Sequence, residues 1–333
     1  GEDKSIVIYL LILTVGFPGA RIVSGWEATE GQFPYQLSIR MVDPTGGVSA
    51  CGASIIHSEW ALTAAHCTAR RVSLVIRAGA VNLQRPQLLF ETTEYKNHPR
   101  FIEALPTVQP DDIGVIKFNR IIEFSDLVKP IRLQASADKN KDYSGVRLHT
   151  SGWGRTWTNG PSPVNLNWVF LRGTTNLECW MAFGGSPIIV DSTICGAYYN
   201  VTSQSTCQGD SGGPLVTYDE DGIETQVGVT SFVSSSGCHT PFPAGFVRPG
   251  HYHEWLLEVT GINFDWEPET ATTTTAAPTE EPEAEEEEGS EEEPEEEEEP
   301  EEEEEEESEE EESDESRESS ESKSSQSSSE SEE

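Results

Sequence analysis

The sequence is poor in positive charge and has no long apolar run. It holds 21 Lys and Arg residues against 60 Asp and Glu residues, for a formal net charge of −39. A chain of this sign is repelled by the phosphate backbone of DNA and RNA, which excludes nucleic-acid binding as its role. The most apolar stretch, residues 5–15, is too short to cross a bilayer, so no membrane span is expected.

That apolar stretch has the features of the central region of a secretory signal peptide. We therefore expect residues 1–21 to be a signal peptide followed by a very short activation segment, and both to be removed. Only six cysteines are present. Six cysteines can pair in fifteen ways, and their spacing alone does not select one of them. Disulfides form in oxidising compartments, which predicts a secreted, extracellular protein.

The negative charge is concentrated at the C-terminal end. From Glu267 onward, 35 Asp and Glu face one Arg and one Lys, so 33 of the 39 net charges lie there. Because this segment has almost no apolar side chains to bury, we expect residues 266–333 to form a disordered tail, first Thr/Pro-rich and then Glu/Ser-rich. Basic proteins, calcium ions or a matrix surface are candidate partners. The alternative is a solvating tail with no specific partner.

Residues 22–265 have the pattern of a single all-β domain. Short runs rich in β-branched residues and bounded by turn formers, such as residues 114–118 and 226–230, predict strands. Residues 251–259 instead carry apolar residues at helical spacing, which predicts a helix. His251 and His253 lie two residues apart, so on a helix they point in different directions. We interpret both as surface residues and not as metal ligands.

Three short motifs supply a base, a carboxylate and a nucleophile in that order. His66 lies in Thr-Ala-Ala-His-Cys, Asp112 begins Asp-Ile-Gly-Val-Ile-Lys, and Ser211 lies in Gly-Asp-Ser-Gly-Gly-Pro. A serine hydroxyl is a poor nucleophile at neutral pH, so it needs an imidazole to take its proton and a carboxylate to orient that imidazole. We assign these roles to Ser211, His66 and Asp112. The nearby His57 and Asp111 are interpreted as a turn residue and a residue outside the motif.

Further landmarks in the same order strengthen the pattern, and together they resemble the chymotrypsin-like serine protease family. The landmarks are Arg-Ile-Val-Ser-Gly from Arg21, Phe-Pro-Tyr-Gln from Phe33, Cys-Gly-Ala-Ser from Cys51, Gly-Trp-Gly from Gly152 and Ser-Phe-Val from Ser231. Within the family, the sequence is most similar to elastase- and chymotrypsin-type secreted proteases of the arthropod kind.

The resemblance implies a fold of two six-stranded antiparallel β-barrels with a C-terminal α-helix, ahead of the disordered acidic tail. It also implies a secreted serine endopeptidase, a hydrolase that cleaves peptide bonds through an acyl-enzyme. Its partners would be protein or peptide substrates and protein protease inhibitors. We expect a monomer without a cofactor or a metal ion.

Several site residues follow from the resemblance. The backbone N–H groups of Gly209 and Ser211 match the family's oxyanion hole. Cleavage between Arg21 and Ile22 by a trypsin-like protease would release an α-amino group that pairs with Asp210 and so activates a zymogen. The resemblance also selects one disulfide pairing, namely Cys51 with Cys67, Cys179 with Cys195, and Cys207 with Cys238.

Substrate preference depends on the pocket for the side chain before the scissile bond. Ser205 stands where trypsin-type enzymes carry an aspartate, and a neutral side chain cannot compensate a buried cation, so cleavage after Arg or Lys should be poor. Ser231, Val233 and Ala244 match substrate-binding positions, and Val233 should narrow the pocket. We expect elastase-like cleavage after Ala, Val or Leu, with a chymotrypsin-like preference for aromatic residues or Leu as the alternative.

Two further interpretations concern the rest of the chain. Asn200-Val-Thr is a glycosylation sequon in a loop that we expect to be exposed. A second class of function also stays open, that of a matrix- or cation-binding protein that acts mainly through the acidic tail while its protease domain is silent.

Overall fold

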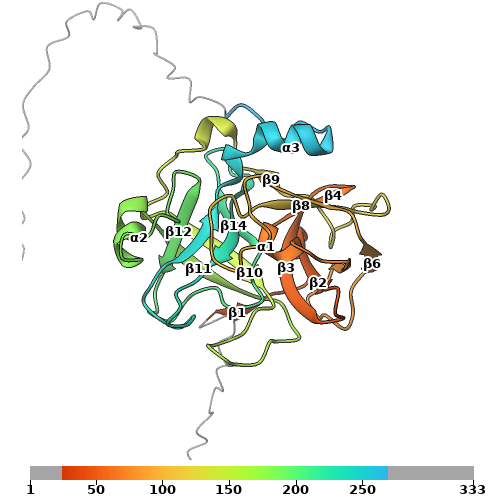
Figure 1. The fold of residues 1–333 in the computed structure, drawn as a ribbon, viewed down its shortest axis with the longest axis horizontal. Coiled ribbons are helices and arrows are strands. Elements are labelled where there is room, and N and C mark those ends of the chain that lie inside the picture. The colour runs from red at the N-terminus through yellow and green to blue at the C-terminus, as the bar shows by residue number, and fades with distance from the viewer. Residues whose placement is uncertain (1–24, 269–333) are drawn as a thin grey trace, which may run out of the picture. The chain divides into compact units, whose positions relative to one another are not determined.

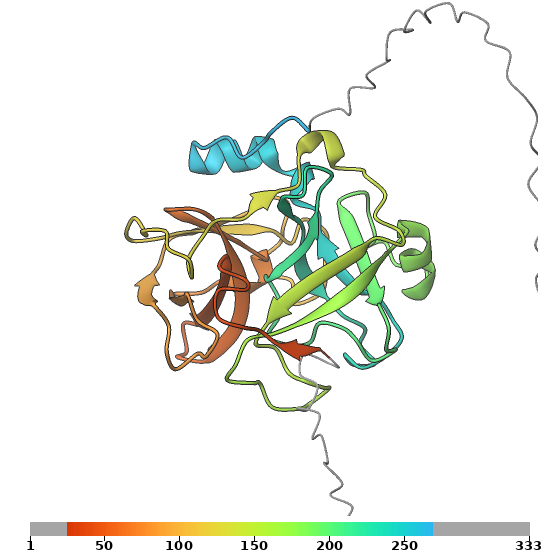
Figure 2. The same ribbon diagram turned by 180° about the vertical axis from the view of Figure 1, so that it is seen from behind.

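The computed structural model describes residues 25–268, which form two β-sheets with short helices at their edges (Figures 1 and 2). The predicted signal peptide, Arg21, Ile22 and all of the acidic tail beyond Pro268 lie outside the described residues. No helix within residues 25–268 is both long and apolar enough to cross a membrane.

The first sheet is antiparallel and is built from the N-terminal half of the chain, in the order β6-β5-β2-β3-β4-β8-β7. Its strands are β2 (Gln36–Val42), β3 (Val48–His57), β4 (Trp60–Thr63), β5 (Ser73–Ala78), β6 (Leu88–Thr92), β7 (Tyr95–Asn97) and β8 (Gly114–Lys117). Side chains alternate along these strands, so Leu74, Ile76 and Ala78 of β5 are buried while the residues between them are partly exposed. Because the end strands β6 and β7 do not pair with each other, this sheet is a curved half-barrel.

The second sheet contains a closed six-stranded barrel, because β11 pairs with both β10 and β12 at the two ends of the path β11-β10-β13-β14-β15-β12. Its members are β1 (Trp26–Glu27), β9 (Arg132–Leu133), β10 (Arg147–Gly152), β11 (Asn167–Thr174), β12 (Thr193–Tyr198), β13 (Pro214–Tyr218), β14 (Glu224–Phe232) and β15 (Ala244–Val247). β1 and β9 are added at its rim. The predicted all-β fold with two barrel-like sheets is confirmed, but the first is a seven-stranded half-barrel where the resemblance implies a closed barrel of six strands.

Three α-helices occur within the described residues, namely α1 (Ala65–Thr68), α2 (Asn176–Ala182) and α3 (His253–Thr260). Residues 25–268 also include two 3-10 turns, η1 (Ser136–Asp138) and η2 (Pro249–His251). A capping box begins α2, in which Thr175 and Glu178 bond to each other's backbone N–H. Gly261, with φ of 73°, ends α3 in a left-handed conformation that glycine adopts at little cost. The helix predicted near residues 251–259 is therefore present.

The prediction that His253 lies on the surface is wrong. Its exposed fraction is 8%, and its Nε2 lies 2.7 Å from the backbone oxygen of Gln134. The η2 turn ends just before α3 and directs the first residue of the helix toward the segment that joins the two barrels. His251 is partly buried at the end of η2.

Each end of the domain packs against the barrel that is formed by the other half of the chain. β1, near the N-terminus, pairs with β11 of the second barrel. At the other end, Tyr252, Trp255 and Leu256 pack into the hydrophobic cluster of the first barrel, although they follow the second barrel in the sequence. Each barrel is thus completed by residues from the far end of the chain.

All three disulfides form as the resemblance implied, and the described residues contain no free cysteine. The Cys51–Cys67 bridge connects β3 to α1 across 16 residues of sequence. Closing a loop of that length contributes about 3 kcal/mol to stability in the chain-entropy account. This bridge also fixes α1, which carries His66, against the first barrel.

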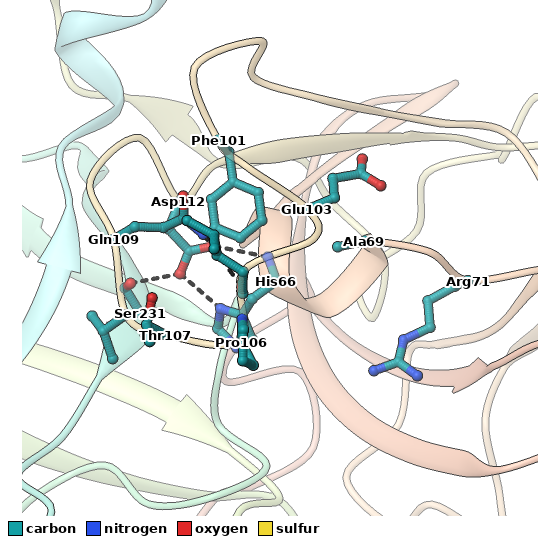
Figure 3. Close-up of a pocket in the computed structure, with 12 residues that line it drawn as sticks. His66, Ala69, Arg71, Phe101, Glu103, Pro106, Thr107, Gln109, Asp112 and Ser231 are labelled. Carbon is teal, nitrogen blue, oxygen red and sulfur yellow. Dashed lines mark hydrogen bonds and ion pairs between the residues drawn. The ribbon is translucent and has the colours of Figure 1, made fainter.

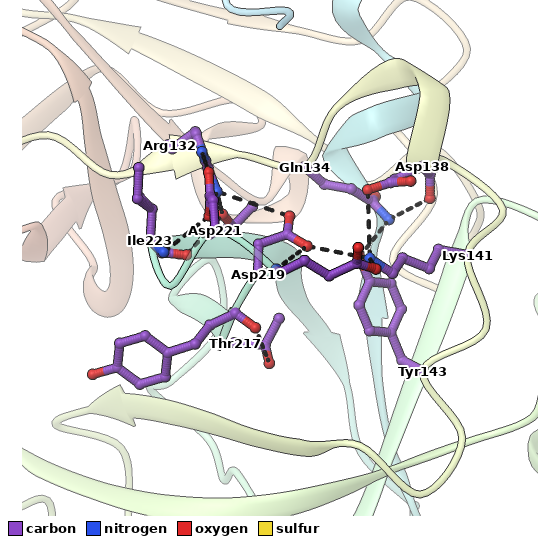
Figure 4. Close-up of polar contacts among 12 residues, drawn as sticks. Arg132, Gln134, Asp138, Lys141, Tyr143, Thr217, Asp219, Asp221 and Ile223 are labelled. Carbon is purple, nitrogen blue, oxygen red and sulfur yellow. Dashed lines mark hydrogen bonds and ion pairs between the residues drawn. The ribbon is translucent and has the colours of Figure 1, made fainter. Parts of the chain in front are cut away.

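A polar network joins Arg132 and Lys141 to Asp219 and Asp221 (Figure 4). The Arg132 guanidinium donates to Asp221 at 2.9 Å and lies 3.8 Å from the centre of the Trp266 ring. The Trp266 indole N–H donates to the Leu133 oxygen at 2.7 Å. Nearby, the Lys141 ammonium group donates to Asp219 at 3.2 Å. The chain is therefore fixed at Trp266, just before the acidic segment begins.

Candidate active site

His66 is held by Asp112 through two bonds. The His66 backbone N–H donates to Asp112 Oδ1 at 2.8 Å, and the ring nitrogen Nδ1 lies 2.7 Å from Asp112 Oδ2 (Figure 3). Asp112 is 4% exposed, whereas the His66 side chain is about a third exposed. The pair therefore orients the imidazole with Nδ1 toward the interior.

The charge of Asp112 changes the acidity of His66. Burial acts to lower the pKa of His66, but the Asp112 carboxylate outweighs it through its charge and its hydrogen bond, so the pKa lies above the usual value of 6.5. A raised pKa makes the imidazole a stronger proton acceptor, which suits a general base.

Ser231 completes the environment of Asp112. Its hydroxyl donates to Asp112 Oδ2 at 2.6 Å, so this oxygen accepts from both Ser231 and His66. Ser231 lies in β14 of the second barrel, while His66 and Asp112 belong to the half of the chain that forms the first. The bond therefore fixes the carboxylate at the junction of the two barrels.

Ser211 lies at the same junction, in the loop before β13. Its backbone oxygen accepts from the N–H of Gly52 at 2.7 Å, which ties the loop to β3 of the first barrel. The next residue, Gly212, has φ of 78°, and a Cβ there would collide with Gly52 and Thr63. Only glycine allows this approach. The Ser211 hydroxyl has no hydrogen-bond partner within residues 25–268, so it is available to His66 or to a substrate.

The backbone N–H groups of Gly209 and Ser211 are two hydrogen-bond donors in this loop. Gly209 has φ of 104°, a conformation that favours glycine, and its neighbour across the loop is Gly154. In the described part of the chain, no group accepts a hydrogen bond from the N–H of Gly209 or of Ser211. Two such N–H groups can stabilise the negative charge that develops on a carbonyl oxygen under attack.

Asp210, between those donors, is 1% exposed. Its carboxylate accepts from the N–H groups of Gly154 at 2.7 Å and Cys207 at 2.9 Å. A Cβ on Gly152 or Gly154 would collide with this carboxylate, which explains the two glycines of the Gly-Trp-Gly motif. Burial raises the pKa of Asp210 to about 6 despite the two hydrogen bonds. No cation within residues 25–268 pairs with it.

A cleft of about 400 Å³ lies beside His66 and Asp112 (Figure 3). Ser231 lines one part, and the segment before Asp112 supplies another wall with Phe101 and Gln109. Arg71 and Glu103 line the cleft together with the apolar side chains of Leu105 and Val108. It has the size and the exposure to receive an extended peptide segment.

The predicted specificity residues are placed in the second barrel. Ser205 is 4% exposed and Ala244, at the start of β15, is fully buried. Val233 is partly buried and packs against the Cys207–Cys238 bridge. The bridge therefore joins the segment of Ser205 to the segment of Val233.

The residues set aside in the sequence have other roles. Asp111, with φ of 57°, accepts from the Tyr252 hydroxyl at 2.9 Å and from Arg100 at 2.7 Å. His57 ends β3, where its ring accepts from the Glu59 N–H at 3.3 Å. Local motifs identified neither Tyr252 nor the bond from Ser231 to Asp112, because these partners lie more than 100 residues apart in the sequence.

Within the described part of the chain, one cluster of metal-ligand residue types occurs, and it includes His66. Cys51, His66 and Cys67 place their ligand atoms within 4.8 Å of one another. Both cysteines are joined in a disulfide, so neither sulfur is a thiolate that could bind a metal.

Comparisons with known proteins agree with this arrangement. The trypsin family model matches residues 22–256. A collagenase of Hypoderma lineatum is 34% identical over 73% of this chain and 89% of its own length. Human chymotrypsin-like elastase family member 3A is 31% identical over 72% of the chain and 88% of its own length. Serine protease 1 of Drosophila melanogaster is 34% identical, with 73% and 87% covered.

A solved structure of HL collagenase superimposes on the fold with a TM-score of 0.65, at 34% identity, and covers 72% of this chain and 99% of the other. These matches confirm the resemblance that the motifs indicated. With its two barrels, three disulfides and site between the barrels, the chain belongs to the trypsin family and is a serine endopeptidase.

Proposed function

We propose that the chain is a secreted, zymogen-activated endopeptidase that cleaves after small to medium apolar residues by means of Ser211, His66 and Asp112. The observation that carries the proposal is the pairing of His66 with a buried Asp112. The loop of Ser211, whose hydroxyl has no hydrogen-bond partner among residues 25–268, is bonded to Gly52 of the first barrel. The family supplies the reaction class, and protein or peptide chains are its substrates.

The mechanism follows from these contacts. The Ser211 hydroxyl attacks the scissile carbonyl carbon and gives its proton to His66, and the imidazolium then returns that proton to the departing amine. Asp112, held by Ser231, keeps the imidazole oriented and stabilises its positive charge. The N–H groups of Gly209 and Ser211 donate to the oxygen that becomes negative, and the loss of one such donor typically costs about 100-fold to 1,000-fold in rate. Water then hydrolyses the acyl-enzyme by the same steps.

The raised pKa of His66 predicts how activity depends on pH. Only the neutral imidazole accepts a proton, so the rate should rise with pH as His66 loses its proton. Because the Asp112 carboxylate raises the pKa of His66 above 6.5, the pH at which activity is half-maximal should be higher than 6.5. Activity that persists unchanged below pH 6.5 would contradict the proposed base.

The preference for apolar residues is supported by the pocket side chains. Ser205 is neutral and buried, so nothing at that position can pair with an Arg or Lys side chain. Val233 and Ala244 carry methyl groups where a wide pocket needs glycine. One methylene more or less in such a pocket changes the transition-state energy by about 1–3 kcal/mol, so selectivity should be graded.

Activation is proposed to follow cleavage between Arg21 and Ile22. The buried Asp210 carboxylate supports this, because it has two hydrogen bonds but no counter-ion in the described residues, and its pKa is raised. An ammonium group that reached Asp210 would neutralise it. Since Asp210 stands between the two proposed oxyanion donors, its pairing would fix their orientation.

The remaining assignments concern location and the acidic tail. Three disulfides support an oxidising extracellular location. We propose a catalytic domain over residues 22–265 and an acidic tail from residue 266 that governs where the enzyme is retained, by binding basic proteins, calcium or matrix. Asn200 is exposed, as a glycosylation site requires.

The first experiment measures turnover of peptide substrates that end in Ala, Val, Leu, Phe or Arg. The secreted chain is cleaved after Arg21 and compared with its Ser211→Ala variant. We expect turnover after Ala, Val and Leu that is absent from the variant, and in Val233→Gly we expect the ratio of Phe to Val cleavage to rise at least tenfold. Fast cleavage after Phe by the unmodified chain would select the chymotrypsin-like alternative. Folded, cleaved protein without Ser211-dependent turnover would instead favour a function of the acidic tail.

A further inference from the structure

A second hollow, of about 350 Å³, lies on the outer face of the second barrel and shares no lining residue with the cleft beside His66. Phe33, Trp168, Phe170 and Tyr218 supply aromatic walls, and Arg147 and Glu224 lie at one end. We name it the aromatic groove. It forms where the outer face of β10, β11 and β13 is left uncovered by the segment of Phe33.

The aromatic rings continue beyond the groove as a connected row. Trp26 of β1 lies 5.1 Å from Trp168 of β11, Trp168 lies 4.8 Å from Phe170, and Phe170 lies 5.8 Å from Tyr199, measured between ring centres. Trp26 is 45% exposed and Tyr218 is 64% exposed. Aromatic side chains gathered on a surface in this way mark interaction sites more often than isolated ones do.

The polar groups at the floor of the groove already have partners. His149 Nε2 lies 3.3 Å from the buried Tyr35 hydroxyl and 3.5 Å from a Glu224 oxygen. Burial lowers the pKa of His149 to about 4, so this ring is neutral at physiological pH. Glu224 also accepts a hydrogen bond from Tyr218. The floor therefore does not need a charged ligand.

The exposed rim, in contrast, offers donors without acceptors. The indole N–H groups of Trp26 and Trp168 have no hydrogen-bond partner among the described residues. The Arg147 guanidinium stacks on Phe170 at 4.8 Å, and Arg172 lies directly opposite Arg147 in the register of β10 and β11. Neither arginine has an ion-pair partner within residues 25–268. A ligand that matches this surface carries flat or rigid apolar groups and hydrogen-bond acceptors, and it has few hydrogen-bond donors.

A proline-rich peptide has this chemistry. Proline lacks an N–H, and in the polyproline II conformation its carbonyl groups point outward without internal hydrogen bonds. Its rings pack between aromatic side chains, and the preformed extended chain loses little entropy on binding. We propose that the aromatic groove and the adjoining Trp26 bind a proline-rich segment of another protein in the polyproline II conformation.

The proposal is tested with the full secreted chain carrying Ser211→Ala, so that the result does not depend on catalysis. Its binding to a decaproline peptide is measured by calorimetry, with a Gly-Ser peptide of equal length as the reference. Trp26→Ala is compared with Trp180→Ala, because both indoles are 45% exposed but Trp180 lies on α2. Arg172→Gln is compared with Arg120→Gln, another exposed arginine.

We expect saturable binding of decaproline alone, weakened at least tenfold by Trp26→Ala and less by Arg172→Gln, with no change in the two matched controls. Equal binding of both peptides would overturn the proposal, as would equal losses in Trp26→Ala and Trp180→Ala. Tighter binding of a decaglutamate peptide than of decaproline would also overturn it, because the arginines and not the aromatic rings would then select the ligand.

Discussion

Cleavage between Arg21 and Ile22 should reverse the effect of Asp210 on stability. In the uncleaved chain the pKa of Asp210 is about 6, against 3.8 for an ordinary aspartate. Between these values the folded state holds a proton that the unfolded state has lost, so the free energy of unfolding falls as pH rises. A difference of about 2.2 pH units corresponds to about 3 kcal/mol, which should be lost between about pH 4 and pH 7.

After cleavage, the new Ile22 ammonium group should stabilise the charged carboxylate and bring the pKa of Asp210 below 3.8. The contribution of this group to stability is then present above that pH and is lost only in acid. The measurement is urea unfolding of the Ser211→Ala chain, uncleaved and cleaved, from pH 4 to pH 7. Other titrating groups are the same in both forms, so the difference between the two curves isolates the pair.

We expect the stability of the cleaved form, relative to the uncleaved form, to increase by about 3 kcal/mol over this range. Asp210→Asn supplies the control, since its side chain does not titrate and the difference should become flat. Parallel curves for the two forms of the Asp210 chain would refute the pairing, whatever the activity of the cleaved enzyme.

Three substitutions test contacts in the structure. Ser231→Ala removes the hydroxyl that donates to Asp112 at 2.6 Å. Because a hydrogen bond to a charged group is worth about 1.5–3 kcal/mol, this substitution should lower kcat about tenfold with little change in KM. An unchanged kcat in a peptide assay would contradict the role given to this hydrogen bond. Tyr252→Phe removes the buried hydroxyl bonded to Asp111 and should lower the melting temperature by about 2–6 °C in calorimetry, whereas an unaltered midpoint would show that the bond contributes nothing. Trp266→Ala should lower the midpoint by about 2–4 °C without changing kcat, and a loss of kcat would contradict a purely anchoring role.

Local patterns in the sequence were sufficient to predict strands such as those at residues 114–118 and 226–230, and the final helix. The alternation of apolar residues in β5 and the β-branched run in β14 are properties of the segments themselves, so the structure agrees with them. The motifs around His66 and Ser211 likewise identified the loops that meet between the barrels. The disulfide pairing needed the family resemblance, because spacing alone left fifteen arrangements.

Contacts between distant segments could not be predicted in this way. His253 has the sequence context of a surface residue, but the carbonyl of Gln134, 119 positions earlier, covers it. Tyr252 reaches Asp111 across 141 positions, and Ser231 reaches Asp112 across 119. These partners are brought together by the way in which the barrels pack, for which no local pattern exists.

The exchange of terminal elements between the barrels has a consequence for synthesis. The first barrel is closed over by Trp255 and Leu256, which follow almost every other residue of the domain as the chain is made. While the ribosome still holds the chain at α3, the first barrel lacks that packing layer. The packing layer that Trp255 and Leu256 supply to the first barrel is therefore among the last parts of the domain to be made, after both segments that meet at Asp112 and Ser231.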